Sequence, residues 1–264
     1  AETGRIYIMN IDHCNTHSSF KDKVYMSNLC QEITLPTTPI NHIDDPDGEI
    51  ALCILSAINL GLIKEKDELK DLCDLSVRAL EEIIDYQEYP VEAAKKSTLA
   101  RRSLGIGYIG LAHYLAKNKV KYNDKEAWKL VDEVTEAFQY YLLKASNDLA
   151  KERGACEYFN KTKYSDGILP LDTYKKDVDN IVKRKLSYDW TAIRQDIKKH
   201  GLRHSTLSAQ MPSESSSVVS NATNGVEPPR DFLSIKKSKK GTLKQIVPDY
   251  NRLKNFYTLL WDMK

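Results

Sequence analysis

Apolar residues recur at helical spacing over most of the chain beyond residue 60. They stand three and four positions apart, which places them on one face of a helix. The first such segment ends ahead of Pro90, a residue that cannot continue a helix. The pattern predicts helices over residues 64–86, 124–153, 171–183, 189–199 and 251–263.

The longest predicted helix covers residues 124–153. Asn123 is its expected N-cap, because Glu126 follows three residues later as in a capping box. Gly154 is placed to end the helix, since glycine readily takes the left-handed conformation of a helix C-terminus. The expected buried stripe consists of Trp128, Val131, Val134, Phe138, Leu142, Ala145 and Leu149.

Shorter apolar runs between polar residues and prolines are typical of strands and loops. The expected strands are residues 5–9, 50–57 and 205–210, with a hairpin over 232–247 that turns at 238–241. Strands that alternate with helices predict a helix-rich α/β fold. No proline- or glycine-rich linker divides residues 1–264, so we expect a single segment.

Composition narrows the class of protein. Of 264 residues, 41% are hydrophobic and 29% charged, with a net charge of +2, which excludes a disordered chain and predicts no direct binding to nucleic acid. The longest apolar stretch, residues 50–63, is too short and polar to span a membrane. Five scattered cysteines without a CxxC motif favour a reducing, cytoplasmic setting.

Candidate chemistry is densest around residues 27–32. In an extended segment Asn28, Cys30 and Glu32 would share one face, with the amide and the carboxylate each about 6–7 Å from the thiol. The three groups offer a hydrogen-bonding amide, a reactive thiol and a general base. Taken alone the pattern is weak, because a turn residue, a core thiol and a surface acid explain it equally simply.

Two further segments add context. Cys53 stands in the apolar run of residues 50–57, where a cysteine can also act as a small core hydrophobe. The serine-rich turn of residues 212–217 precedes an expected helix start, whose free N–H groups can bind phosphate. Plain helix capping is the alternative for these serines. Glu214 fits an anion site only if its carboxylate points away from the phosphate.

These motifs together resemble the large, catalytic subunit of aerobic class I ribonucleoside-diphosphate reductases. The resemblance covers essentially the whole chain. It rests on residues 27–32, 51–53, 212–216 and 220–229, and on the spaced pattern of Trp190, Ile193 and residues 201–204.

The resemblance implies the second half of a ten-stranded α/β barrel, with a central finger loop at about residues 24–36. It implies that Cys30 becomes a thiyl radical that abstracts the ribose 3′-hydrogen, that Glu32 takes the 3′-hydroxyl proton, and that Asn28 binds the substrate hydroxyls. Cys53 would be half of a redox-active disulfide whose partner lies outside this chain. The implied substrate-diphosphate site is Pro212, Ser213, Glu214, Ser215 and Ser216.

The same resemblance implies reduction of ribonucleoside diphosphates to 2′-deoxyribonucleoside diphosphates for DNA synthesis. This chain would bind no cofactor or metal itself. The radical would come from a small subunit with a dimetal/tyrosyl centre, and thioredoxin or glutaredoxin would supply the dithiol reductant. ATP and dNTP effectors would bind elsewhere. Because Ala1 is not a methionine and Cys53 lacks its partner, we expect a complementary N-terminal half and an inactive isolated chain.

Two other functions remain open: a catalytically silent assembly module, and a thiol redox or metal-binding protein. His13, Cys14 and His17 are metal-capable, but a second ligand pair is missing, so we expect no zinc site. Residues 105–110 fit GxGxxG, but the preceding residues are too charged for a dinucleotide-binding strand.

Three other features are expected to be structural. Cys73 lies on an apolar helical stripe and is expected in the core. Tyr140 and Tyr141 resemble a radical-transfer tyrosine pair but lie within the long predicted helix, so we expect them to pack there. The lysine-rich residues 236–240 are expected to form a solvated hairpin turn, with contact to a polyanion as the alternative.

Overall fold

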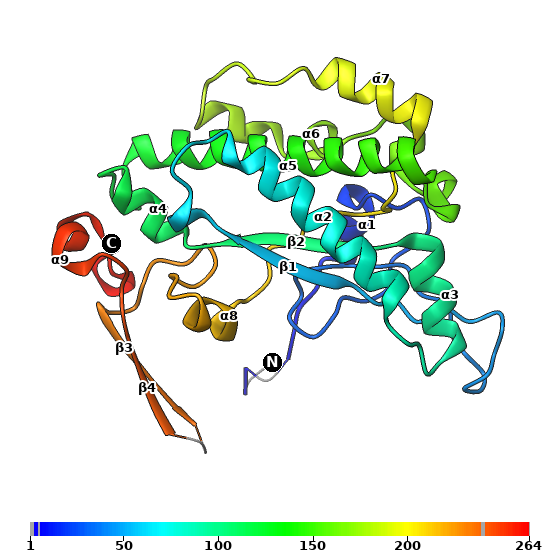
Figure 1. Ribbon diagram of the computed structural model, residues 1–264, viewed down its shortest axis with the longest axis horizontal. Helices are drawn as coiled ribbons and strands as arrows, with labels where there is room; N and C mark the ends of the chain where they lie inside the picture. Colours follow the sequence, from blue (N-terminus) through cyan, green and yellow to red (C-terminus); the bar gives the residue numbers. More distant parts are fainter. Residues whose placement is uncertain (1–2, 5, 239–240, 264) are drawn as a thin grey trace.

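A computed structural model describes residues 3–4, 6–238 and 241–263 of the chain (Figure 1). Its strands and α-helices are α1 (Ile11–His17), β1 (Ile54–Asn59), α2 (Glu68–Tyr86), α3 (Glu92–Arg101), β2 (Leu104–Ile109), α4 (Leu111–Lys117), α5 (Lys125–Arg153), α6 (Pro170–Thr173), α7 (Trp190–His200), α8 (Glu214–Val219), β3 (Leu233–Ser238), β4 (Gly241–Ile246) and α9 (Tyr250–Leu253). Short 3-10 turns are η1 (Leu60–Leu62), η2 (Glu157–Lys161), η3 (Lys163–Asp166), η4 (Lys176–Asn180), η5 (Lys254–Phe256) and η6 (Leu260–Asp262).

A parallel sheet forms the centre of the molecule. β1 pairs with β2 along its whole length, from Ile54 opposite Leu104 to Asn59 opposite Ile109. On the other edge of β2, residues 205–210 run parallel through a single bridge, from Ile106 to Ser208, and nearby backbone hydrogen bonds. The predicted α/β class is confirmed. Within the described ranges the three segments do not close into a barrel.

Helices α2 and α5 pack together against this sheet, and α7 packs against α5 (Figure 1). The main core lies between these elements and includes Cys73, Phe138 and Leu142, so the prediction for Cys73 is confirmed. No helix of the described residues is long and apolar enough to cross a membrane.

The two best-patterned helices agree with prediction. α2 begins four residues later than expected, and α5 spans 29 residues and ends at Gly154, whose φ is +84°. The helix starts one residue later than predicted: Asp124, not Asn123, occupies the N-cap position. Trp128 is 42% exposed, and its neighbour Ala127 is the buried residue of that turn.

The predicted N-terminal strand is wrong over residues 6–9, and Arg5 lies outside the described residues. Ile6, Tyr7 and Ile8 are exposed, and no ladder with another described strand satisfies their backbone. A strand depends on a neighbouring strand for its hydrogen bonds, which the local apolar pattern cannot supply. The chain instead enters α1 at Ile11.

Two predicted helices are broken into short turns. Residues 171–183 form α6 and η4, separated at Tyr174, whose backbone is extended. Residues 251–263 form α9, η5 and η6 and are interrupted at Tyr257, which is buried and donates from its hydroxyl to the Pro248 carbonyl at 2.8 Å. Anchoring that ring in the core takes precedence over helix continuity. The helix predicted over 189–199 is confirmed as α7.

The predicted hairpin is confirmed as the antiparallel pair β3–β4, which projects from the body of the molecule (Figure 1). Leu233 pairs with Ile246 at its base and Ser238 with Gly241 at its tip. The expected turn residues Lys239 and Lys240 lie outside the described residues.

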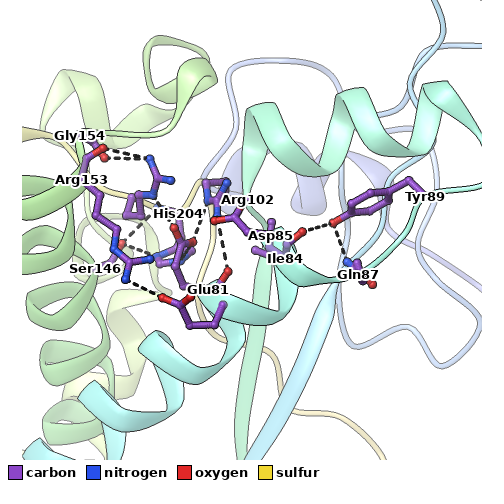
Figure 2. A network of polar contacts seen from close by, with 12 residues as sticks. Glu81, Ile84, Asp85, Gln87, Tyr89, Arg102, Ser146, Arg153, Gly154 and His204 are labelled. Atoms are coloured by element: carbon purple, nitrogen blue, oxygen red, sulfur yellow. Dashed lines mark hydrogen bonds and ion pairs between the residues drawn. The ribbon is translucent and has the colours of Figure 1, made fainter.

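A buried carboxylate joins the sheet to the helices (Figure 2). Glu81 of α2 is 0% exposed and accepts hydrogen bonds from Arg102 Nε at 2.7 Å and Arg203 Nε at 2.6 Å. His204 Nε2 lies 3.1 Å from the same carboxylate, and His204 Nδ1 lies 2.9 Å from Ser146 Oγ of α5. Arg102 comes directly before β2, and residues 203–204 come directly before the third parallel segment. One side chain therefore holds the entry points of two strands.

These contacts decide the protonation states in the cluster. Burial raises the pKa of Glu81, but hydrogen bonds from His204, Arg102 and Arg203 outweigh it and hold the pKa at about 2. Burial lowers the pKa of His204, and its contact with Glu81 only partly offsets that effect. The histidine is therefore neutral at pH 7, while Glu81 is charged and faces two arginines.

Replacing Glu81 by glutamine is expected to lower the free energy of unfolding by about 3–5 kcal/mol at pH 7, because two arginines lose their buried counter-charge. Urea denaturation followed by circular dichroism measures the change. Glu152→Gln is the control, since Glu152 pairs with Arg78 at the surface, and this variant should be affected far less. Equal losses in both variants would contradict the assignment.

The same carboxylate predicts acid sensitivity. Its pKa is about 2 in the folded chain against an ordinary 4.5, so its contribution is complete above pH 4.5 and is lost as the pH falls toward 2. The stability advantage of the wild type over Glu81→Gln should therefore shrink over this interval. Denaturation curves collected from pH 6 to pH 2.5 test this, and parallel pH dependences of the two proteins would refute it.

Candidate functional site

The finger loop, residues 24–36, is a tight turn rather than an extended strand. Gln31 has a φ of +61°, its N–H donates to the Asn28 carbonyl at 3.2 Å, and the Asn28 N–H donates to the Ile33 carbonyl at 3.3 Å. The expectation that alternation places Asn28, Cys30 and Glu32 on one face is therefore wrong, because a left-handed residue interrupts the two-residue period. The loop itself sets the positions of these side chains.

The three finger residues occupy different environments. Cys30 and Asn28 are exposed at the turn, whereas Glu32 is half-buried on its return arm. The Asn28 side-chain oxygen accepts from the Ile33 N–H at 3.4 Å, so it also stabilises the turn. Cys30 is thus presented at the tip, with a carboxylate two residues behind it.

A buried arginine anchors the base of the finger loop. Arg101, 3% exposed at the end of α3, donates to Asp22 at 2.8 Å from Nη2 and to Glu49 at 2.8 Å from Nε. Asp22 lies just before the finger loop, and Glu49 lies just before the segment that carries Cys53. Arg101 therefore fixes both chemistry-bearing segments to one helix end. Sequence reasoning missed it, although a pair of adjacent arginines before a buried strand is a usable signal, since a buried arginine requires partners.

Cys53 lies against the finger loop. It packs on a small core of Phe20, Val24, Ile33, Leu35 and Ala209, so the finger loop and the sheet meet at this thiol. Gly105 of β2 leaves room for the sulfur: a Cβ at that position would lie 3.0 Å from Cys53 Sγ.

The surroundings keep Cys53 protonated. Burial and the nearby Glu32 carboxylate raise the pKa of the Cys53 thiol to about 12. The structure thus brings Glu32 and Cys53 together, as expected for two groups of one site, and gives the sulfur the form that can donate hydrogen rather than the nucleophilic thiolate.

The serine-rich turn forms the start of α8. Ser213 is buried, its hydroxyl donates to the Asn224 side-chain oxygen at 3.1 Å, and it accepts from the Gly225 N–H at 3.1 Å. The hydroxyls of Ser216 and Ser217 bond to backbone carbonyls of the turn. These hydroxyls hold the turn in shape, as the capping alternative predicted.

The backbone of this turn keeps its binding capacity. Among the described residues, the N–H groups of Glu214, Ser215 and Ser216 have no hydrogen-bond acceptor. The Glu214 carboxylate is exposed and lies 3.5 Å from Lys236 of β3, so it points away from the turn. This arrangement can bind an anion through backbone N–H groups, with Pro212 exposed at its edge.

Several other motifs have structural roles. The glycines of residues 105–110 lie within and just after β2 rather than in a strand-to-helix loop, and Gly107 approaches the Ala209 carbonyl too closely to carry a side chain. Tyr140 stacks on Tyr188 with ring centroids 4.6 Å apart, and Tyr141 lies edge-on to the same ring, which confirms their role in packing.

The metal-capable motif near the N-terminus lies on α1, where the rings of His13 and His17 are 6.2 Å apart. In the described part of the chain, no three His, Cys, Asp or Glu side chains are grouped to hold a metal ion.

Comparison with known proteins gives consistent matches. A sequence model of the family described as "Ribonucleotide reductase, barrel domain" matches residues 1–259. The chain is 62% identical to the ribonucleoside-diphosphate reductase subunit alpha of Haemophilus influenzae and 60% identical to the reductase 1 subunit alpha of Escherichia coli, in each case over 100% of this chain and 35% of the relative. Identity to the subunit alpha of Enterobacteria phage T4 is 45% over 99% of this chain and 34% of that protein. The chain thus spans about a third of the length of these relatives.

The cysteine environments predict an order of alkylation. Cys30 is exposed, whereas burial raises the pKa of Cys53, Cys73 and Cys156 to about 12. At pH 8 roughly one part in ten thousand of such a thiol is ionised, so iodoacetamide should modify Cys30 first, and Cys53 about tenfold faster per added pH unit. Peptide mass spectrometry over time measures both rates.

Denatured protein serves as the control, since all five cysteines should then react at similar rates. Cys30→Ser should remove the fast phase and Cys53→Ser should leave it intact. Reaction of Cys53 as fast as Cys30 in the native chain would contradict the described burial.

Proposed function

Because the chain belongs to the family of the ribonucleotide reductase barrel domain, we propose that it carries the radical-forming part of a ribonucleoside-diphosphate reductase active site. The observation that supports this best is the placement of Glu32 beside the protonated Cys53 thiol, with Cys30 presented at the tip of the same loop. Such a site would convert ribonucleoside diphosphates to 2′-deoxyribonucleoside diphosphates, and the conversion makes this chain part of an oxidoreductase.

Each side chain has a role in this proposal. A thiyl radical on Cys30 abstracts the 3′-hydrogen of the ribose, and Glu32 accepts the 3′-hydroxyl proton as a general base. The Asn28 amide binds the substrate hydroxyls. The 2′-hydroxyl leaves as water, and Cys53 with a second thiol outside this chain supplies two electrons and two hydrogens, which leaves a disulfide. The 3′-hydrogen then returns from Cys30, so the radical is regenerated.

We place the substrate diphosphate on the start of α8. The free N–H groups of Glu214, Ser215 and Ser216 can hold its oxygens, and the bonds of Ser213 fix the backbone that presents them. Pro212 sets the entry to the turn. The outward direction of Glu214 removes the electrostatic objection to an acid in this position.

We propose that further polypeptide completes the site. The parallel segments described here would form half of a ten-stranded barrel, and Leu52 and Leu55 beside the sheet are 37% and 44% exposed, which suits coverage by a complementary half. The radical would come from a small subunit with a dimetal/tyrosyl centre, and thioredoxin or glutaredoxin would reduce the disulfide. No part of this chain is assigned to effector nucleotides.

Reconstitution tests the proposal. The chain is combined with the complementary polypeptide, a small subunit and a dithiol, and deoxyribonucleotide formation is measured. Cys30→Ser should reduce the product to background, and Glu32→Gln should lower the rate about 10²–10⁴-fold, as expected for loss of a general base. Cys14→Ser, at a thiol of α1, is the matched control and should leave turnover unchanged.

Turnover that survives Cys30→Ser would overturn the assignment. If the complementary polypeptide fails to bind this chain in a pull-down, the chain is instead the silent assembly module. A disulfide or bound metal formed within this chain alone, seen by native mass spectrometry, would favour the thiol redox or metal-binding alternative.

A further inference from the structure

A cavity of about 240 Å³ lies beside the return arm of the finger loop, on the side of α5. Its walls come from residues 17–20, the finger residues 32–34, the segment 163–173, Gln139 of α5 and the third parallel segment of the sheet. The cavity thus connects Glu32 with a helix that carries none of the candidate site residues.

Three buried side-chain atoms on residues that line this cavity have no hydrogen-bond partner among the described residues. They are Ser18 Oγ, Glu32 Oε2 and Gln139 Nε2. A buried polar atom without a partner is costly, and most such atoms in native proteins bond to protein or to ordered water. Three of them around one cavity indicate a shared occupant.

The neighbouring polar groups are already satisfied. Ser19 Oγ donates to the Ser205 carbonyl at 2.8 Å, and Ser208 Oγ donates to Gln139 Oε1 at 2.8 Å. The second bond holds the Gln139 amide by its oxygen, so the nitrogen that remains is the donor available to the cavity. Phe138, next to Gln139, is buried in the main core and keeps this part of α5 in place.

The three atoms define the chemistry of the occupant. Gln139 Nε2 can only donate, the Glu32 carboxylate can only accept, and the Ser18 hydroxyl can do both. An anion would be repelled by Glu32, and an apolar ligand would leave all three atoms unpaired. Water both donates and accepts, and it is stable in a cavity that offers two to four polar partners.

We propose that ordered water in this cavity bridges Gln139 and Ser18 to the Glu32 carboxylate, so that Gln139 is a positioning residue for Glu32. The catalytic consequence rests on the proposed function, in which Glu32 accepts a proton from the substrate. Water held between α5 and the finger loop fixes the direction of the carboxylate, which the exposed turn alone does not.

The water itself is tested in the isolated chain, without turnover. Water–protein NOE and ROE spectra of the ¹⁵N-labelled wild type should show long-lived water next to the Gln139 side-chain amide. A high-resolution crystal structure should show density that joins this amide to Glu32. Absence of ordered water there overturns the inference and leaves the proposed function untouched. A side chain of the complementary polypeptide inside the cavity of the assembled enzyme also overturns it.

The positioning role is tested by Gln139→Leu in the reconstituted enzyme. Loss of one hydrogen-bonded bridge should lower kcat about tenfold with little change in KM, because substrate binding does not involve the cavity. Gln139→Asn keeps the amide and should recover most of the rate, since a water can span the shorter side chain. Thr173→Val is the matched control: Thr173 lines the same cavity, but its hydroxyl bonds to the Pro170 carbonyl.

The outcomes separate the two hypotheses. If Gln139→Leu behaves like Thr173→Val, or raises KM with kcat unchanged, the positioning role is wrong although Cys30→Ser still abolishes turnover. If Cys30→Ser is active, the proposed function fails whatever the cavity holds. Melting temperatures of all variants identify any loss of activity that comes from unfolding.

Discussion

The buried Glu81 carboxylate is the constraint around which this structure is arranged. A charge with no solvent exposure is stable only when paired and hydrogen-bonded, and Glu81 meets that condition through Arg102, Arg203 and His204. The partners come from the residues that enter two parallel strands, and Ser146 extends the cluster to α5 (Figure 2). Arg102 adopts a left-handed φ of +48° in this position. The local backbone cost is accepted because the alternative, an unpaired buried charge, costs more.

Arg101, the neighbour of Arg102, extends this framework to the candidate site. Consecutive arginines at the end of α3 thus serve two buried carboxylate clusters, one toward α2 and one toward the finger loop. Because Arg101 holds both Asp22 and Glu49, the position of the finger loop relative to Cys53 depends on a side chain that does not belong to the site. The flexible-looking loop of residues 24–36 is therefore fixed at its base by charge pairing and along its arms by the small core around Cys53.

The candidate site combines three different environments within a short stretch of structure. Cys30 is open to its surroundings, Glu32 is half-buried with one oxygen unpaired, and Cys53 is kept as a thiol by burial and by the Glu32 charge. Such differences let thiols of one chain perform unlike chemistry. The open side of the sheet near Leu52 and Leu55 leaves the groups uncovered in this chain, which spans about a third of its relatives. A complete reaction chamber needs additional protein on that side.

The sequence by itself determined the helices with long apolar periods, α2, α5 and α7, the hairpin, the α/β class and the residues of the candidate site. Its local patterns failed where long-range contacts decide the backbone: residues 6–9 have no strand partner, and the buried ring of Tyr257 interrupts the last predicted helix. Alternation also could not reveal the left-handed Gln31 that turns the finger loop. Only the tertiary structure placed Glu32 beside Cys53 and matched Glu81 with residues more than a hundred positions away, because burial and charge pairing depend on which segments meet in space.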